Sequence, residues 1–415
     1  MEWTENKIVP ERAMLVSLDT GEYDAEASLN ELAELARSAG AEVAAQTMQK
    51  RPAPDAGTCV GEGKLEEIRD FCAANAIDLL IFDRELGPIQ QRNIENATNV
   101  RVIDRTMLIL DIFALRARSK EGALQVELAQ MKYQLPRLTG RGTALSRLGG
   151  GIGTRGPGES KLETDRRHIR RRIESLRSQL QQLEEQRGRL RRRRKKDGVL
   201  TVALVGYTNA GKSTLMNALT DAGVLAEDKL FATLDPTARA LRLPHGQTVM
   251  LIDTVGLVRR LPHHLVEAFR STLEEAAQAD VILNVCDASS DEAAVHLQVT
   301  NELLAELGCE NHAVIPVMNK CDCLPPDCVA ASVGGAVRIS AKTGQGLQEL
   351  LLAVERELPK VRRVRLRVPF DRAGILASVR AEAQLLSEEY TADGICAEAL
   401  VDAVMEARLS EFIQE

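Results

Sequence analysis

Residues 200–219 spell LTVALVGYTNAGKSTLMNAL, a short apolar run followed by a glycine-bounded loop and the apolar spacing of a helix. The loop matches the Walker A pattern in the strand-to-helix context that this pattern requires. Its backbone N–H groups can surround phosphates, and the start of the helix adds partial positive charge. The stretch therefore predicts a parallel α/β domain with a nucleotide site. The loop residues expected to bind the nucleotide are Gly206, Tyr207, Thr208, Asn209, Ala210, Gly211, Lys212 and Ser213.

Two later segments are expected to complete the phosphate side of this site. Lys212 is predicted to reach the β and γ phosphates as a catalytic residue, and the Ser213 hydroxyl to hold Mg²⁺. The segment Asp253, Thr254, Val255 and Gly256 follows a predicted strand. It would place a carboxylate near the metal and a glycine N–H near the γ phosphate. The predicted switch segment is Phe231, Ala232, Thr233, Leu234 and Asp235. Thr233 would close on Mg²⁺ when the γ phosphate is present, which makes it a metal ligand and a catalytic residue.

A third group of residues predicts which base the site selects. Asn319, Lys320, Cys321 and Asp322 follow the apolar run AVIPVM. A carboxylate at the fourth position can accept hydrogen bonds from guanine N1–H and N2–H, and adenine offers neither donor. The loss of such bonds discriminates between bases by a factor on the order of 10⁴, so the site is expected to prefer GTP to ATP. Ser340, Ala341 and Lys342, at another strand end, are expected to present a backbone N–H to guanine O6.

Three other patterns have a simpler interpretation. Cys321, Cys323 and Cys328 could suggest a metal site, but no histidine lies nearby and Cys321 belongs to the base-reading segment. His263 and His264 are expected to be exposed loop residues and not catalytic groups. The glycines of residues 61–64 (GEGK) lack the spacing of a phosphate loop, so a turn and a helix start are expected there.

The chain is predicted to be a multidomain α/β protein. Apolar runs and helical patterns alternate at 13–118, which predicts a parallel α/β domain over residues 1–119. A basic helical hairpin is expected over 120–197, the nucleotide domain with a mostly parallel sheet over 198–359, and a small α+β appendage over 360–415. In this appendage an alternating strand around residues 361–368 precedes a helical pattern at Ile375 to Leu386.

The expected hairpin concentrates positive charge in an acidic chain. Residues 137–196 contain 19 Lys and Arg against 6 Asp and Glu, while the whole chain has a net charge of -7. Leucine, isoleucine and methionine step by three and four from Leu124 to Leu138 and from Ile169 to Leu183, with Leu190 one heptad further, which predicts two coiled-coil seams. The connector, residues 139–158, has eight glycines and carries Arg141, Arg147 and Arg155. Although a flexible linker is the simpler alternative, we expect these arginines to contact RNA.

Composition excludes several other classes of protein. No apolar stretch reaches the ~18 residues of a membrane helix, and the acidic N-terminus predicts no secretory signal. Eight cysteines without a CxxC pair indicate reduced thiols, so a cytoplasmic location is expected. Seven Phe, four Tyr and one Trp are too few for RNA binding by base stacking.

The guanine-site motifs, the connector GGIGTRGPGE and the continuation SKLETDRR at 160–167 closely resemble the HflX family of ribosome-associated translational GTPases. The resemblance covers roughly residues 13–358. It implies GTP hydrolysis, binding to the large ribosomal subunit and its RNA with the hairpin tip near the peptidyl transferase centre, and splitting of stalled or idle ribosomes under stress. We expect a monomer whose ligands are GTP, GDP and Mg²⁺.

Two alternatives and one catalytic question remain open at this stage. The chain could assist tRNA modification, as the related TrmE proteins do, or could be an RNA-binding scaffold with structural GTP. Leu257 and Val258 stand where other GTPases place a water-orienting glutamine. Asn209 stands where related potassium-activated GTPases carry an asparagine that coordinates the ion, and this resemblance implies a catalytic role for Asn209 with K⁺; alternatively, Asn209 only stabilises its loop.

Overall fold

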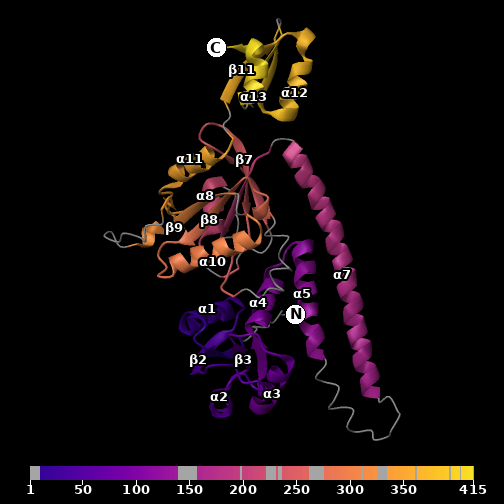
Figure 1. The fold of residues 1–415 in the computed structure, drawn as a ribbon, viewed down its shortest axis with the longest axis vertical. Helices are drawn as coiled ribbons and strands as arrows, with labels where there is room; N and C mark the ends of the chain where they lie inside the picture. Colours follow the sequence, from indigo (N-terminus) through magenta and orange to yellow (C-terminus); the bar gives the residue numbers. More distant parts are fainter. Residues whose placement is uncertain are drawn as a thin grey trace, which may run out of the picture. The chain divides into compact units, whose positions relative to one another are not determined.

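The computed structural model describes residues 10–138, 157–196, 199–220, 230–231, 236–260, 275–309, 312–324, 334–359, 362–391, 394–401 and 403–414 (Figure 1). The chain forms two compact units. The first contains Met1–Gln181, Lys229–Phe231 and Arg259–Phe269, and the second contains Gln182–Asp228, Ala232–Val258 and Arg270–Glu415. No helix in the described ranges is long and apolar enough to cross a membrane.

The first unit contains a parallel four-stranded sheet in the order β2-β1-β3-β4. Its strands are β1 Arg12–Asp19, β2 Glu42–Lys50, β3 Leu79–Phe82 and β4 Arg101–Asp104. Its helices are α1 Ala25–Ser38, α2 Glu62–Asn75, α3 Pro88–Thr98 and α4 Arg105–Arg116. We call β1 to α4 the N-terminal module. The order of these elements along the chain confirms the predicted alternation of strands and helices. Apolar side chains such as Val16, Leu80 and Ile94 are buried in one core.

The GEGK segment is a turn and a helix start, as its glycine spacing predicts. Gly61 is the N-cap residue of α2, and Lys64 forms an exposed ion pair with Glu67 at 2.8 Å. The Lys64 ammonium group thus pairs with a carboxylate of the same helix.

Two helices form the predicted hairpin. α5 spans Lys120–Arg137 and α7 spans Pro157–Lys196, and they run side by side in opposite directions, with Arg172 donating to Glu127 at 2.6 and 2.8 Å (Figure 1). Ile173 and Leu176 are buried, but Leu190 is 59 % exposed, so the predicted extension of the seam to Leu190 is wrong. Arg141, Arg147 and Arg155 lie outside the described residues.

A six-stranded sheet in the order β10-β9-β8-β5-β7-β6 forms the centre of the second unit. Its strands are β5 Thr201–Gly206, β6 Thr237–Arg242, β7 Thr248–Asp253, β8 Val281–Asp287, β9 Ala313–Asn319 and β10 Val337–Arg338. The associated helices are α8 Lys212–Thr220, α10 Ala293–Glu306 and α11 Leu347–Glu357. All pairs are parallel except β6 with β7, which confirms the predicted mostly parallel sheet. The carboxyl ends of the parallel strands therefore share one edge.

The C-terminal segment is an antiparallel sheet in the order β12-β13-β11-β14 with two helices. Its elements are β11 Arg362–Val368, α12 Gly374–Glu382, β12 Gln384–Thr391, β13 Gly394–Val401, α13 Ala403–Leu409 and β14 Ile413–Gln414. The predicted helix around Ile375 to Leu386 is too long, because Leu385 and Leu386 belong to β12.

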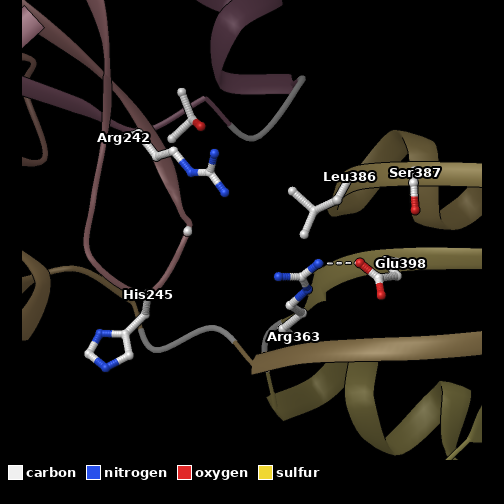
Figure 2. A pocket seen from close by; sticks show the side chains of 8 residues that line it. Arg242, His245, Arg363, Leu386, Ser387 and Glu398 are labelled. Carbon is white, nitrogen blue, oxygen red and sulfur yellow. Dashed lines mark hydrogen bonds and ion pairs between the residues drawn. The ribbon is translucent and has the colours of Figure 1, made fainter.

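A cavity of about 340 Å³ lies between this sheet and the turn after β6 (Figure 2). Arg242 and Arg363 line it, and Figure 2 shows the Arg363 guanidinium beside Glu398. Because Glu398 also pairs with Arg365, its single negative charge is shared between two guanidinium groups.

Candidate active site

The loop between β5 and α8 has two positions that only glycine can occupy. Gly206 has φ +151°, and a Cβ there would lie 2.0 Å from the carbonyl oxygen of Val285. Gly211 has φ +88°, and a Cβ would lie 2.3 Å from Nδ2 of Asn319. These glycines let the loop turn closely against two neighbouring strand ends. The backbone can thus approach a phosphate chain with its N–H groups exposed.

Lys212 begins α8 and turns back across this loop. Its Nζ donates to the carbonyl oxygens of Gly206 at 2.9 Å and Tyr207 at 2.8 Å. The side chain is 6 % exposed, and burial lowers the pKa of Lys212 to about 8 despite the opposing charge of Asp253. A compact positive group is therefore held inside the loop, where it can meet phosphate oxygens.

Ser213 and Asp253 provide the oxygen atoms that suit Mg²⁺. The Ser213 hydroxyl donates to Oδ2 of Asp253 at 2.7 Å, and Asp253 is fully buried at the end of β7. A hydroxyl and a carboxylate are hard ligands of the kind Mg²⁺ prefers, so these residues fit the ion. The predicted third participant, Thr233, lies outside the described residues.

The segment after β7 lies against the phosphate loop. A Cβ on Gly256 would be 2.7 Å from Thr208 Cγ2 and 3.3 Å from Lys212 Nζ, so glycine is required there. Leu257 donates its N–H to Gly206 O at 3.2 Å and accepts from Thr208 N at 2.7 Å. Thr254 is buried, and its hydroxyl donates to Leu204 O at 2.7 Å. The DTVG segment is thus fixed beside Lys212.

Asn319 joins the phosphate loop to the base-reading loops. Its Nδ2 donates to Ala210 O at 2.8 Å, and its Oδ1 accepts from Ala341 N at 2.9 Å. Asn319 is 2 % exposed, so both bonds are shielded from water. Its neighbour Lys320 has φ +62° and pairs with Asp287 at 2.7 Å. One asparagine therefore aligns three segments that are distant in sequence.

Asp322 is held as a charged acceptor by Ser340. The Ser340 hydroxyl donates to Asp322 Oδ1 at 2.6 Å, and this bond is the main reason why the pKa of Asp322 is lowered. Asp322 itself is exposed, while Ser340 is fully buried beneath it. Lys342 is exposed at the same edge. The carboxylate can therefore accept hydrogen bonds from an incoming base.

Some predicted residues are placed differently or lie outside the described residues. The Phe231 side chain is buried against Phe113 with ring centroids 4.6 Å apart, so only its backbone could contribute to a nucleotide site. Ala232, Leu234, Asp235, His263, His264 and Cys328 lie outside the described residues. Within the described ranges no three His, Cys, Asp or Glu side chains form a metal-binding cluster, and Cys321 and Cys323 are free thiols.

Sequence reasoning missed one contact beside the phosphate loop. Tyr207 stacks on His296 of α10 with ring centroids 3.8 Å apart. Nothing in the periodicity of α10 distinguishes His296, because the contact joins residues that are far apart in sequence.

Three family models match consecutive parts of the chain. Residues 26–114 match a GTP-binding GTPase N-terminal region, and residues 116–194 match a GTP-binding GTPase middle region. Residues 201–320 match a model described as a 50S ribosome-binding GTPase. These matches and the geometry above define a P-loop GTPase, an enzyme that hydrolyses GTP to GDP and phosphate.

Two relatives of similar length, both named GTPase HflX, show which family of GTPases this is. A GTPase HflX from Lacrimispora saccharolytica is 49 % identical over 99 % of this chain and 98 % of its own. GTPase HflX from Escherichia coli K12 is 44 % identical over 92 % of this chain and 90 % of its own. A GTP-binding protein from Sulfolobus solfataricus, solved with GDP, is 25 % identical over 84 % of this chain and 98 % of its own, with a TM-score of 0.45. The chain belongs to the HflX family of GTPases.

Proposed function

We propose that this GTPase binds the large ribosomal subunit and its RNA through the basic hairpin and splits stalled or idle ribosomes under stress. GTP hydrolysis would reset binding. The observation that carries the proposal is the charge of α7, whose exposed arginines include Arg167, Arg170, Arg171 and Arg192. RNA phosphates are the polyanion that such a helix suits. The match to a 50S ribosome-binding GTPase model supports the large subunit as the partner.

Replacing Arg141, Arg147 and Arg155 with alanine is expected to weaken binding to the large subunit without changing GTP affinity. If each arginine meets one phosphate, the slope of log K against log salt should fall by roughly 2 to 3. Sedimentation with purified 50S subunits at several salt concentrations measures both effects. A matched control replaces the exposed Arg69, Arg101 and Arg239, which removes the same charge elsewhere. Unchanged sedimentation, or recovery of tRNA and a modifying enzyme instead of subunits, would contradict the proposal.

The residues after Gly256 suggest why the enzyme needs help with the chemical step. Leu257 and Val258 are each 2 % exposed, and their apolar side chains cannot orient a water molecule. When bound, Mg²⁺ would neutralise charge on the phosphates, and Ser213 and Asp253 are the residues that would hold it. Lys212 and the Gly256 N–H would bind phosphate oxygens. We infer that hydrolysis is slow until a further positive charge or the ribosome is present.

Hydrolysis is expected to be faster in KCl than in NaCl at equal ionic strength, and Asn209→Ala is expected to remove this difference. Asn209 has φ +60° and is exposed in the phosphate loop, and its side chain makes no hydrogen bond to any described residue. This geometry favours a role toward a bound ion over the alternative that Asn209 stabilises its own loop. A positive ion there would stabilise charge that develops on the phosphates. Equal phosphate release in both salts would exclude K⁺ from the reaction.

A further inference from the structure

Two short segments of the GTPase part belong to the first unit. Leu230 directly precedes the predicted switch segment and Phe231 is its first residue, while Arg259 and Arg260 follow the DTVG segment by three and four residues. All four residues make specific contacts with the N-terminal module. The module therefore holds the chain at the start of the predicted switch segment and just after the DTVG segment.

Arg260 enters a site built for a guanidinium group. Its NH2 nitrogen donates to Asp83 Oδ2 at 2.7 Å, to Asp83 O at 3.0 Å and to Ser28 Oγ at 2.6 Å. Its guanidinium carbon lies 3.8 Å from the ring centroid of Tyr23, in a cation–π contact. Asp83 is 1 % exposed, so the ion pair is largely desolvated on the carboxylate side.

A second ion pair fixes the position of Asp83. Arg105, which is 3 % exposed, donates to Asp83 Oδ1 at 3.0 Å and to Glu31 at 2.6 Å. It also donates to the carbonyl oxygen of Arg259 at 3.2 Å. Asp83 is therefore oriented toward Arg260 by residues of the module itself.

The position of this site in the sheet is informative. Asp83 directly follows β3, and Tyr23 and Ser28 lie in the connection after β1 and in α1. In the order β2-β1-β3-β4 the chain reverses its direction of growth between β1 and β3. Open α/β sheets bind ligands at the carboxyl ends of the strands at such a point. Here a side chain of the same polypeptide occupies that position.

The other segment is anchored by an apolar contact. Phe231 is 1 % exposed and meets Phe113 of α4 edge to face at 4.6 Å, and Leu230 donates its N–H to Ser38 Oγ at 3.2 Å. Phe231 and Arg260 also have positive φ values of 56° and 49°. Non-glycine residues keep this conformation only where their surroundings fix it. Both anchor residues are thus strained, and the module contacts offset the strain.

The chain between Arg260 and the phosphate loop is short. Leu257, which pairs with Gly206 and Thr208, is only three residues before Arg260. Three residues span at most ~11 Å. If Arg260 moves farther than this length of chain allows, Leu257 and Gly256, next to Lys212, must move with it.

We propose that the N-terminal module carries a guanidinium-binding site for Arg260, and that Asp83 acts through Arg260 as a positioning residue for GTP hydrolysis. The site takes the Arg260 side chain as its ligand and keeps the Gly256 N–H ordered beside Lys212. Phe231 anchors the start of the predicted switch segment through its apolar contact with Phe113. Without the Arg260 anchor, the DTVG segment must become ordered during each turnover, which lowers the rate of GTP hydrolysis.

The test measures GTP turnover of the full chain without ribosomes. Arg260→Ala is expected to lower kcat about tenfold, which corresponds to ordering roughly one backbone residue. KM for GTP and affinity for GDP should stay within about twofold, since no nucleotide contact is lost. Arg260→Lys should recover part of kcat, because lysine keeps the charge but offers a single donor group. Hydrogen exchange in residues 253–260 should increase in the alanine variant.

Arg84→Ala is the matched control. Arg84 follows Asp83, its side chain is 25 % exposed against 31 % for Arg260, and it pairs with Glu22 within the module. The Arg84→Ala variant should leave kcat unchanged.

Asp83→Asn tests the site directly but leaves Arg105 partly unpaired, so circular dichroism must first show that this variant folds. If folded, Asp83→Asn combined with Arg260→Ala should be no slower than Arg260→Ala alone. Unchanged or increased kcat in Arg260→Ala, or an equal loss in Arg84→Ala, would overturn the proposal.

Discussion

Replacing Asp322 with asparagine is expected to lower affinity for GTP by a factor on the order of 10⁴ and to create affinity for XTP. The Asp322 carboxylate, kept ionised by the Ser340 hydroxyl, can accept from guanine N1–H and N2–H together. An asparagine amide would place a donor beside the guanine amino group, and a donor there suits the O2 acceptor of xanthine.

Equilibrium binding of fluorescent GDP and XDP analogues measures this change of base. Asp371→Asn, at an exposed position in the C-terminal segment, is a control that removes the same charge and should leave both affinities unchanged. If Asp322→Asn still prefers GDP to XDP, then Asp322 does not contact the base.

Lys212→Ala is expected to lower kcat for GTP hydrolysis by roughly 10² to 10³. Lys212 is the buried cation of the phosphate loop, held by two loop carbonyls, and alanine offers no replacement for its charge. Because the alanine also leaves Gly206 O and Tyr207 O without their donor, circular dichroism must first show that the variant folds.

Single-turnover release of phosphate from radiolabelled GTP separates this chemical effect from weaker binding. Lys64→Ala is the matched control, because Lys64 also follows closely spaced glycines but pairs with Glu67 on its own helix. A variant at Lys212 that keeps most of its single-turnover rate would exclude this lysine from the reaction.

The positions of the predicted phosphate and base segments at the ends of β5, β7 and β9 could be predicted because each segment is a local sequence pattern that follows an apolar run. Gly206, Gly211 and Gly256 are required by close backbone approaches that a short motif already encodes. The parallel sheets followed from apolar runs separated by helical periodicity. Where the apolar runs and the helical periodicity are clear, the sequence predicts the strands, the helices and the edge of the sheet at which the site lies.

What the sequence did not predict depends on partners far away in the chain. Arg260 and Asp83 are 177 residues apart, and neither belongs to a motif or interrupts a period. β6 is mostly exposed on its edge of the sheet, so the segment TARALR lacks the apolar run that marked the other strands. Leu190 keeps the heptad spacing, but no described helix covers it. Spacing predicts which residues share a face, and not whether another element packs against that face.

The continuity of α7 has a mechanical consequence. Its 40 residues give a rod about 60 Å long, and the chain passes from one compact unit to the other within it, between Gln181 and Gln182. A rod without a break transmits a push applied at one end to the other end with little loss. Gly188, beyond that boundary, is the one glycine of the rod outside its first turn, which contains Pro157 and Gly158; glycine has a weak helical preference, and a side chain at position 188 would touch nothing. Bending would therefore concentrate there, and the stiffness of a single residue would set how much force passes along the molecule.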